Sequence, residues 1–337
     1  MHVKQIFELG LKRGMEADPR GKKVIARNLA RQQKEYDDLK PSHKKYFDLD
    51  RLTNPYPDCA IHVDNGKTAV RRVLAGIDIS AAEILLASQL NERGQTIDLV
   101  ISHHPVGKAL VNLHQVMELT ADVYEQEGIP IHVAEKIMEE RRKEVGRGVH
   151  PLNQFQVIDM AKILGINFIS THTITDNMVD KFIRDMLYTV KPEQVQDIID
   201  MLLTIPEYDT ANHFGSGPRI VSGSPHHRIG KFMVEMTGGT NPSSKVYQEL
   251  SQYGFSTIVG MHMKDESLTK AEKHYMNVII AGHMSSDSLG MNLFLDELEK
   301  QGIEVIPCGG LIRISRNTQK STDSADSRSV GKKKGGK

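Results

Sequence analysis

Three stretches of the sequence place histidine or aspartate directly after a short apolar run. The stretches read DLVISHHP, NFISTHTITD and VIIAGHMSSD, and they contribute His103, His104, His172, Asp176, His283 and Asp287. Imidazole and carboxylate groups without thiolates suit zinc, iron, manganese, cobalt or nickel. A site with few ligands per ion leaves coordination positions open to water, as catalytic metal sites do. The three stretches together therefore predict a metal site.

The spacing within these stretches supports the same hypothesis. His283 and Asp287 are four residues apart, as are His172 and Asp176, so each pair shares one face if a helix begins there. A single histidine after a strand is more often a capping or surface residue than a ligand. His-His-Pro alone is also typical of a strand that ends at proline. Three such boundaries in one chain favour metal binding over these alternatives.

The composition excludes several other kinds of protein. The 337 residues include 15 histidines but only two cysteines, Cys59 and Cys308, which offer neither a disulfide framework nor a thiolate zinc site. The 43 Lys and Arg residues equal the 43 Asp and Glu residues, which argues against nucleic-acid binding through overall positive charge. With no N-terminal signal segment and no apolar run of about 20 residues, we expect a cytoplasmic protein without a membrane helix.

Alternating strands and helices position the candidate residues, which predicts the α/β fold class. In the first half we predict strands over 73–78, 99–102, 129–133 and 167–170, and helices over 81–93, 113–126, 135–144, 153–164 and from 176. In the second half we predict strands over 231–236, 257–259, 278–280 and 303–306, and helices over 243–253, 268–274 and 288–300. Functional groups of open α/β sheets gather at the carboxyl ends of strands, so the three stretches should meet at one sheet edge.

The chain divides into five predicted segments. They are a charged helical extension over 1–57 that packs on the core or a partner, a first α/β half over 58–190, an irregular connection over 191–228, a second α/β half over 229–315, and a disordered basic tail over 316–337.

With these motifs in place, the sequence resembles the Nif-three family, the Ngg-interacting factor three-like proteins. The shared order is a strand into His-His-Pro, then His-Thr-x-x-Asp, then Gly-His with an acidic residue four positions later, across about 70–310. The resemblance implies two similar α/β halves with mixed sheets flanked by helices. It also implies a dinuclear metal centre and a toroidal homohexamer.

The resemblance gives each matching residue an expected role. The implied metal ligands are His103, His104, Asp176 and His283. Asp287 would bridge two divalent ions (zinc, iron or manganese), and His172 would orient the ligands without binding an ion. The family usually has Glu at the position of Asp287, whose side chain is one methylene shorter. The helix that carries Asp287 would therefore have to begin closer to the ions. Otherwise the carboxylate would reach only one of them.

Two classes of function fit this expectation. The first is a metal-dependent hydrolase in which water between the ions attacks a small anionic substrate: a phosphoester, a nucleotide or a cyclic amidine-like group. Family members are often labelled GTP cyclohydrolase I type 2 homologues, which implies opening of a purine ring. The second class is a non-catalytic metal-binding regulatory or assembly protein. DNA binding through the ring is a weaker third possibility, since the chain has no net charge.

Other features give weaker signals. His262 follows the strand 257–259 and reaches the same sheet edge, so it is the candidate general acid or base. Lys108 offers positive charge to an anionic substrate, although a solvated lysine is the alternative we favour. The turn over 237–243 offers backbone N–H groups to a phosphate, but it matches no nucleotide-binding motif, so a plain tight turn fits better. The pair His226 and His227 has no neighbouring carboxylate and is typical of a surface loop.

Overall fold

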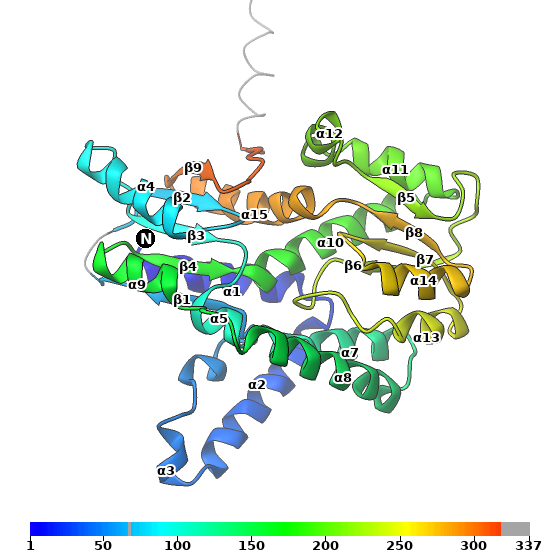
Figure 1. The fold of residues 1–337 in the computed structure, drawn as a ribbon, viewed down its shortest axis with the longest axis horizontal. Helices are drawn as coiled ribbons and strands as arrows, with labels where there is room; N and C mark the ends of the chain where they lie inside the picture. The colour runs from blue at the N-terminus through cyan, green and yellow to red at the C-terminus, as the bar shows by residue number, and fades with distance from the viewer. Residues whose placement is uncertain (67–68, 318–337) are drawn as a thin grey trace, which may run out of the picture.

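Two mixed β-sheets, joined by a pair of long helices, make up the fold (Figure 1). The computed structural model describes residues 1–66 and 69–317. The first sheet has the order β1-β4-β3-β2-β9, with bounds Cys59–Val63, Phe168–Thr171, Leu99–Ser102, Arg72–Gly76 and Glu304–Cys308. The second has the order β5-β8-β7-β6, with bounds Arg219–Ser222, Asn277–Ile280, Phe255–Gly260 and Lys231–Glu235. The α/β class and the two halves with mixed sheets are thus confirmed.

The second sheet repeats the arrangement of the first four strands. In the first sheet β2, β3 and β4 are parallel and β1 is antiparallel at the edge. In the second, β6, β7 and β8 are parallel and β5 is the antiparallel edge. Therefore β7 corresponds to β3, and β8 to β4. The last strand, β9, pairs with β2, so the strand predicted over 303–306 completes the first sheet and not the second.

Helices cover both sheets and link them. Their bounds are α1 Val3–Ala17, α2 Gly21–Asp38, α3 Pro41–Lys44, α4 Ala81–Glu92, α5 Gly107–Val111, α6 Leu113–Val116, α7 Glu118–Gln126, α8 Ile131–Val149, α9 Gln156–Ile163, α10 His172–Val190, α11 Val195–Leu203, α12 Pro206–His213, α13 Val246–Gln252, α14 Asp265–Lys273 and α15 His283–Glu299. Ser80 caps the start of α4, since its hydroxyl accepts from the N–H of Ala82. Among the described residues, no helix is long and apolar enough to cross a membrane.

The two halves are joined by α10 and α15, which follow the corresponding strands β4 and β8 and pack against each other (Figure 1). Their crossing is close at Gly290. A Cβ atom there would lie 2.4 Å from the carbonyl oxygen of Thr175. Because glycine has no side chain, α15 can approach α10 closely at the point where both helices leave their strands.

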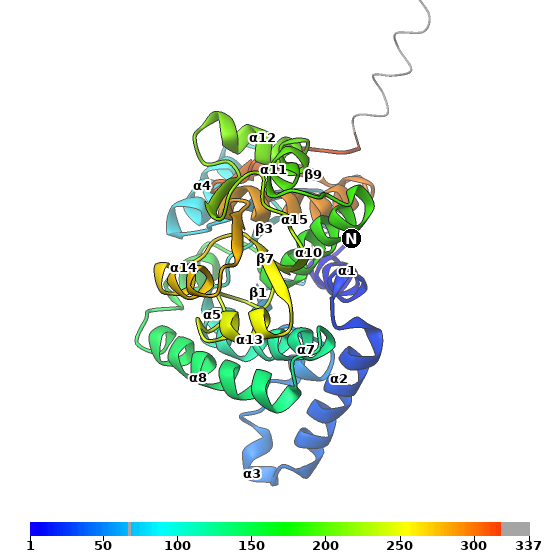
Figure 2. The same cartoon turned by 90° about the vertical axis from the view of Figure 1, so that its right-hand side faces the viewer.

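The N-terminal extension packs on the core mainly through its first helix. Val3, Ile6, Phe7 and Leu11 of α1 are buried, and α1 lies against α10. In contrast, α2 buries one residue, Ile25. Both views show α2 and α3 projecting from the rest of the molecule (Figure 1, Figure 2). The extension therefore packs on this chain's own core through α1, whereas most of α2 is exposed.

Two local predictions differ from the structure. The strand predicted over 129–133 is wrong, because α8 begins at Ile131 directly after Pro130. Proline fixes a backbone angle suited to a helix start, and Ala134, Met138 and Arg141 then recur on one buried face. The helix predicted over 113–126 is interrupted at Met117, which separates α6 from α7.

The segment predicted to be an irregular connection, 191–228, contains α11, α12 and the edge strand β5. Its helices are short, but α11 is strongly amphipathic and buries Val195, Ile198 and Leu202 in the second half. The tail predicted over 316–337 lies outside the described residues from 318 on. Arg316 is described, and its guanidinium donates to both carboxylate oxygens of buried Glu207, at 2.8 and 2.9 Å.

Candidate metal centre

The carboxyl ends of β3, β4 and β8 meet between the two halves. The three stretches therefore come together as predicted, but from two facing sheets and not at the edge of a single sheet. His103 and His104 follow β3 directly, and their backbone N–H groups donate to carbonyls at the end of β2 and just beyond it. The helices α10 and α15 begin at His172 and His283, earlier than predicted. Each histidine therefore lies in the first turn of its helix, and the aspartate four residues later shares its face.

Asp287 lies at the centre of the candidate site, and its two oxygens face different histidines. Its Oδ1 lies 3.4 Å from Nε2 of His103. Its Oδ2 lies 3.3 Å from Nε2 of His104 and 3.3 Å from Nε2 of His283. The shorter side chain therefore reaches both sides, because α15 starts close to the ends of β3. The expected bridging arrangement does not become one-sided.

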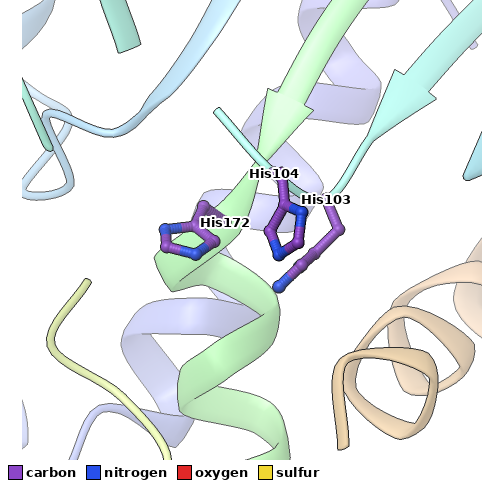
Figure 3. A group of neighbouring side chains, drawn as sticks. All are labelled: His103, His104 and His172. Atoms are coloured by element: carbon purple, nitrogen blue, oxygen red, sulfur yellow. The ribbon is translucent and has the colours of Figure 1, made fainter. Parts of the chain in front are cut away.

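Asp176 and His172 complete the cluster from the first half. Asp176 Oδ1 lies 3.5 Å from Nε2 of His103, and its Oδ2 lies 3.8 Å from Nε2 of His172. Figure 3 shows the imidazole rings of His103, His104 and His172 gathered between the end of β3 and the start of α10. Potential ligand atoms lie within 4.8 Å of one another in three groups: His103, His104, His172; His104, His283, Asp287; and His103, Asp176, Asp287.

Hydrogen bonds behind His103 and His104 orient the two rings. The Thr175 hydroxyl donates to the carbonyl of Thr171 at 3.0 Å, so it accepts from Nδ1 of His103 at 2.8 Å. Asp78 lies 2.8 Å from Nδ1 of His104, and a carboxylate only accepts. Nδ1 therefore bears the hydrogen in both rings. In each ring Nε2 is then the nitrogen that faces the centre and could bind an ion, as in metal-binding histidines.

His172 is oriented in the same way by a buried carboxylate. Asp58 Oδ2 accepts from Nδ1 of His172 at 2.8 Å and from the hydroxyl of Thr173 at 2.7 Å. Burial alone would lower the pKa of His172, but Asp176 and Asp58 raise it to about 9. Without an ion, the ring thus holds a proton on Nε2, facing Asp176. This orientation makes His172 a candidate ligand, whereas the family resemblance implied an orienting role only.

Four buried atoms of the cluster have no hydrogen-bond partner among the described residues. They are His103 Nε2, Asp176 Oδ1, Asp287 Oδ1 and Asp287 Oδ2. An unpaired buried polar atom costs about 1–3 kcal/mol, so four that face each other are costly unless something binds between them. Nitrogen and carboxylate oxygen are suitable donors for a divalent transition metal. The residues therefore fit a metal site.

The charges of the cluster lead to the same conclusion. Burial lowers the pKa of His103 to about 4, so its ring is neutral. Burial raises the pKa of Asp176 to about 8, although the charge of His172 opposes that rise. Burial would also raise the pKa of Asp287, but His103 and His104 hold it well below its usual range. A cation would displace the protons on Asp176 and His172, so metal binding should release protons.

His262 lies beside the cluster, at the strand end that corresponds to His103 and His104 in the first half. Its Nδ1 lies 2.9 Å from Oδ1 of Asn241, and its ring centroid lies 4.5 Å from that of His283. Burial lowers the pKa of His262 to about 4, so the ring is neutral. With Nδ1 held by Asn241, its Nε2 can accept a hydrogen bond or a proton.

A cavity of about 280 Å³ opens onto the cluster. It is lined by His104, His172, Asp176, His262, His283 and Asp287, and the turn after β6 contributes Thr237, Gly239, Thr240, Asn241 and Pro242. Of the described residues that line this metal cavity, none is lysine or arginine. Lys108 pairs instead with Asp50 and Asp48. His226 and His227, which were predicted to lie in a surface loop, lie in an exposed turn and do not line the cavity.

The residues that orient the rings from behind were not predicted from the sequence. Asp78 follows β2, so the rule that functional groups lie at carboxyl strand ends could have found it. Asp58 precedes β1, and only the antiparallel pairing of β1 with β4 brings the start of β1 to this edge. His172 could have been found as a candidate ligand from its spacing, because His172 and Asp176 repeat the spacing of His283 and Asp287.

The fold and the site define a class: two-sheet α/β proteins with a buried His/Asp cluster that suggests a metal site. No protein-family model and no curated protein matches the sequence. Among solved structures, the chain is similar to a NIF3 superfamily protein from Sphaerobacter thermophilus, at 28% identity over 76% of this chain and 92% of that one, with a TM-score of 0.67. The predicted resemblance to the NIF3 superfamily is thus confirmed by structure. It is also similar in fold to reduced HcgD from Methanocaldococcus jannaschii, at 14% identity over 79% and 94% of the two chains, with a TM-score of 0.50.

Proposed function

We propose that this chain is a metal-dependent hydrolase that holds two divalent ions, zinc, iron or manganese. One ion would be held by His103, Asp176 and Asp287 Oδ1, and His172 would complete this group. The other would be held by His104, His283 and Asp287 Oδ2. The observation that supports this most strongly is the position of Asp287, whose two buried, unpaired oxygens face the two groups of ligands.

The two groups differ in how far solvent reaches them. The side chains of His103 and Asp287 are each 1% exposed. Those of His104 and His283 are 26% and 41% exposed and line the cavity. An open coordination position is the mark of a catalytic site, and a closed set of ligands that of a structural one. This supports substrate binding at the His104–His283 side of the site.

Bound ions of this kind act as Lewis acids and activate water. The chain's own residues then position and accept protons. His262 is neutral and borders His283, so its Nε2 is placed to take a proton from a nucleophile in the cavity. Asn241 holds the ring in this orientation. None of the described residues that line the cavity is lysine or arginine, so bound ions would have to balance the negative charge of a substrate.

The size of the cavity favours a small substrate. At about 280 Å³ it lies at the lower end of ligand pockets, which span roughly 300–1,000 Å³. A phosphoester, a nucleotide or a cyclic amidine-like ring, as in a GTP cyclohydrolase-like reaction, remains the proposed substrate class. A toroidal homohexamer is the assembly that we propose from the family, and light scattering of the purified protein measures it.

The alternative function is a non-catalytic metal-binding regulatory or assembly protein. The observation that favours it is the almost complete burial of His103, Asp176 and Asp287, which is typical of a closed structural site. If neither ion has a coordination position open to water, this alternative replaces the hydrolase proposal.

The test combines metal analysis with a substrate panel. Protein purified without added metal is analysed for bound ions and then assayed on phosphoesters, nucleotides and cyclic amidines. We expect about two ions per chain, hydrolysis of one class, and loss of both in His104→Ala. His226→Ala removes an exposed histidine outside the site and should change neither. Two bound ions without hydrolysis on the whole panel would favour the non-catalytic alternative.

A further inference from the structure

A second and larger cavity, of about 910 Å³, lies between the projecting helix α2 and the helices α7 and α8. Both views place α2 beside these helices, below the two sheets (Figure 1, Figure 2). Its walls come from α2, from the segment that joins the short 3-10 helix Leu49–Leu52 to β1, from α6 and α7, and from the last turns of α8. It shares no lining residue with the metal cavity.

Cationic side chains dominate the lining of this arginine cavity. They are Arg20, Arg31, Arg51, Arg142, Lys143 and Arg147. Two carboxylates, Glu35 and Glu118, also line it. Because the whole chain has no net charge, this concentration is a local feature and not a property of the composition. A concave surface with an excess of one charge focuses the electrostatic potential and attracts the opposite charge.

The chain itself neutralises several of these cations, but not all of them. Arg51 lies 3.4 Å from Glu35, Arg142 pairs with Glu118, and Lys143 pairs with Glu139 outside the cavity.

Within the described part of the chain, Arg31 and Arg147 form no ion pair and no hydrogen bond. They lie on different walls, Arg31 on α2 and Arg147 on α8. Two free guanidinium groups on different walls suit a ligand with more than one phosphate, since the planar fork of arginine binds phosphate oxygens in pairs.

The remaining lining residues indicate that the ligand also has a non-ionic part. Leu29, Pro55, Val116 and Leu119 contribute apolar surface. Apolar surface and free arginines together match a ring system that bears phosphates. The volume lies within the usual range for such ligands.

We propose that the arginine cavity binds a nucleotide with two or three phosphates, between Arg31 of α2 and Arg147 of α8. This proposal does not depend on the hydrolase function, because the two cavities have separate linings. The same basic lining would also attract inorganic polyphosphate or a single-stranded nucleic acid, so the experiment separates these ligands.

The experiment measures binding by titration calorimetry on the full chain, with a chelator present to keep ions out of the metal centre. The probes are adenosine and guanosine triphosphates, pyrophosphate, adenosine, and a short single-stranded oligonucleotide. We expect the triphosphates to bind more tightly than pyrophosphate and than the oligonucleotide, and adenosine to bind weakly. Arg31→Gln and Arg147→Gln should each weaken triphosphate binding about tenfold.

Two controls locate the binding. Arg93→Gln changes an exposed arginine outside every cavity described above and should leave the affinity unchanged. His104→Ala alters the metal centre and should also leave it unchanged. Three results would overturn the proposal: no triphosphate binding, equal binding by the Arg31→Gln and Arg147→Gln variants, or tighter binding of the oligonucleotide than of any mononucleotide. Pyrophosphate binding equal to that of the triphosphates would contradict a role for the apolar lining.

Discussion

The metal cavity and the arginine cavity differ in the charged side chains that line them. Asp176, Glu235 and Asp287 line the first, together with histidines, and its described lining residues include no lysine or arginine. Six cationic side chains and two carboxylates line the second. Each of the three groups of potential metal ligands found among the described residues includes at least two residues that line the first cavity. A chain without net charge therefore separates a cation-attracting site from an anion-attracting one.

The two cavities also differ in how firmly their side chains are held. In the metal centre, carboxylates and a threonine fix the rings of His103, His104 and His172 from behind. In the arginine cavity, Arg31 and Arg147 are exposed and have no partner in the described chain. Preorganised donors lose little entropy on binding, whereas mobile arginines must be ordered. We therefore expect tight, geometry-sensitive binding at the first cavity and weaker, salt-sensitive binding at the second.

The largest expected effect comes from Asp287→Asn. Asparagine keeps the shape but has a single acceptor oxygen and no charge, so both ions should lose their shared ligand. We expect both ions to be lost on dialysis, measured by elemental analysis, while triphosphate binding at the arginine cavity is unchanged. Asp185→Asn changes an exposed carboxylate on α10 and serves as the control. Full retention of both ions by Asp287→Asn would mean that this residue does not bridge them.

A smaller effect is expected from Asp58→Asn. The amide can turn its NH₂ group toward Nδ1 of His172, which removes the acceptor that orients the ring. Losing such a partner typically costs 10–100-fold in metal affinity. Competition with a fluorescent chelator measures the affinity of each variant. If Asp58→Asn binds metal as tightly as the unmodified chain, His172 is not a ligand whose orientation matters.

Gly290→Ala tests whether the close crossing of α10 and α15 positions the centre. The added Cβ would lie 2.4 Å from the Thr175 carbonyl, so the helices must move apart. We expect a loss of about 1–3 kcal/mol in the free energy of unfolding, and weaker metal binding. Gly148→Ala is the matched control, because a Cβ there meets nothing within 4 Å. It should stabilise α8 by about 0.5–1 kcal/mol, and a loss at this position would contradict the packing argument.

The smallest effect concerns Glu235, whose carboxylate accepts from the hydroxyl of Tyr247 at 2.9 Å. Burial raises the pKa of Glu235 to about 7. Between its ordinary value and pH 7, the folded chain keeps a proton that the unfolded chain has released. The free energy of unfolding that Glu235 contributes therefore falls as the pH rises through this range. Above pH 7 the folded chain bears the full free-energy cost of the buried charge.

Replacing this carboxylate with an amide should remove the pH-dependent cost. Glu235→Gln should raise the free energy of unfolding at pH 8 by roughly 1–3 kcal/mol and leave it nearly unchanged at pH 4. Urea unfolding of the metal-free protein at both pH values provides the measurement. An equal change at the two pH values would show that the buried charge is not the cause.

The extent to which the sequence predicts this structure depends on how local each feature is. The strands 99–102 and 278–280 were predictable because each is a short apolar run that leads into polar residues. The strand predicted over 129–133 fails because Pro130 and the longer periodicity of α8 outweigh a few β-branched residues. The clustering of the candidate metal ligands was predictable for the same local reason, since each lies at a strand end or within the first turns of the following helix.

The features that depend on tertiary packing were not predictable. Asp58 reaches His172 only because β1 lies antiparallel beside β4, which a single sequence does not reveal. The arginine cavity brings Arg31 and Arg147 together from helices that are far apart in the chain, so no motif marks it. The zero net charge even argues against an anion-binding cavity, because the net charge sums over the whole chain and hides a local excess of positive charge.

The central claim is that Asp287 bridges two ions between the two halves. Anomalous diffraction from crystals of the metal-loaded protein, collected at the absorption edge of the bound metal, tests it most directly. We predict two peaks, one among His103, Asp176 and Asp287 and the other among His104, His283 and Asp287. A single peak away from Asp287, or no peak at full metal loading, would contradict the dinuclear centre.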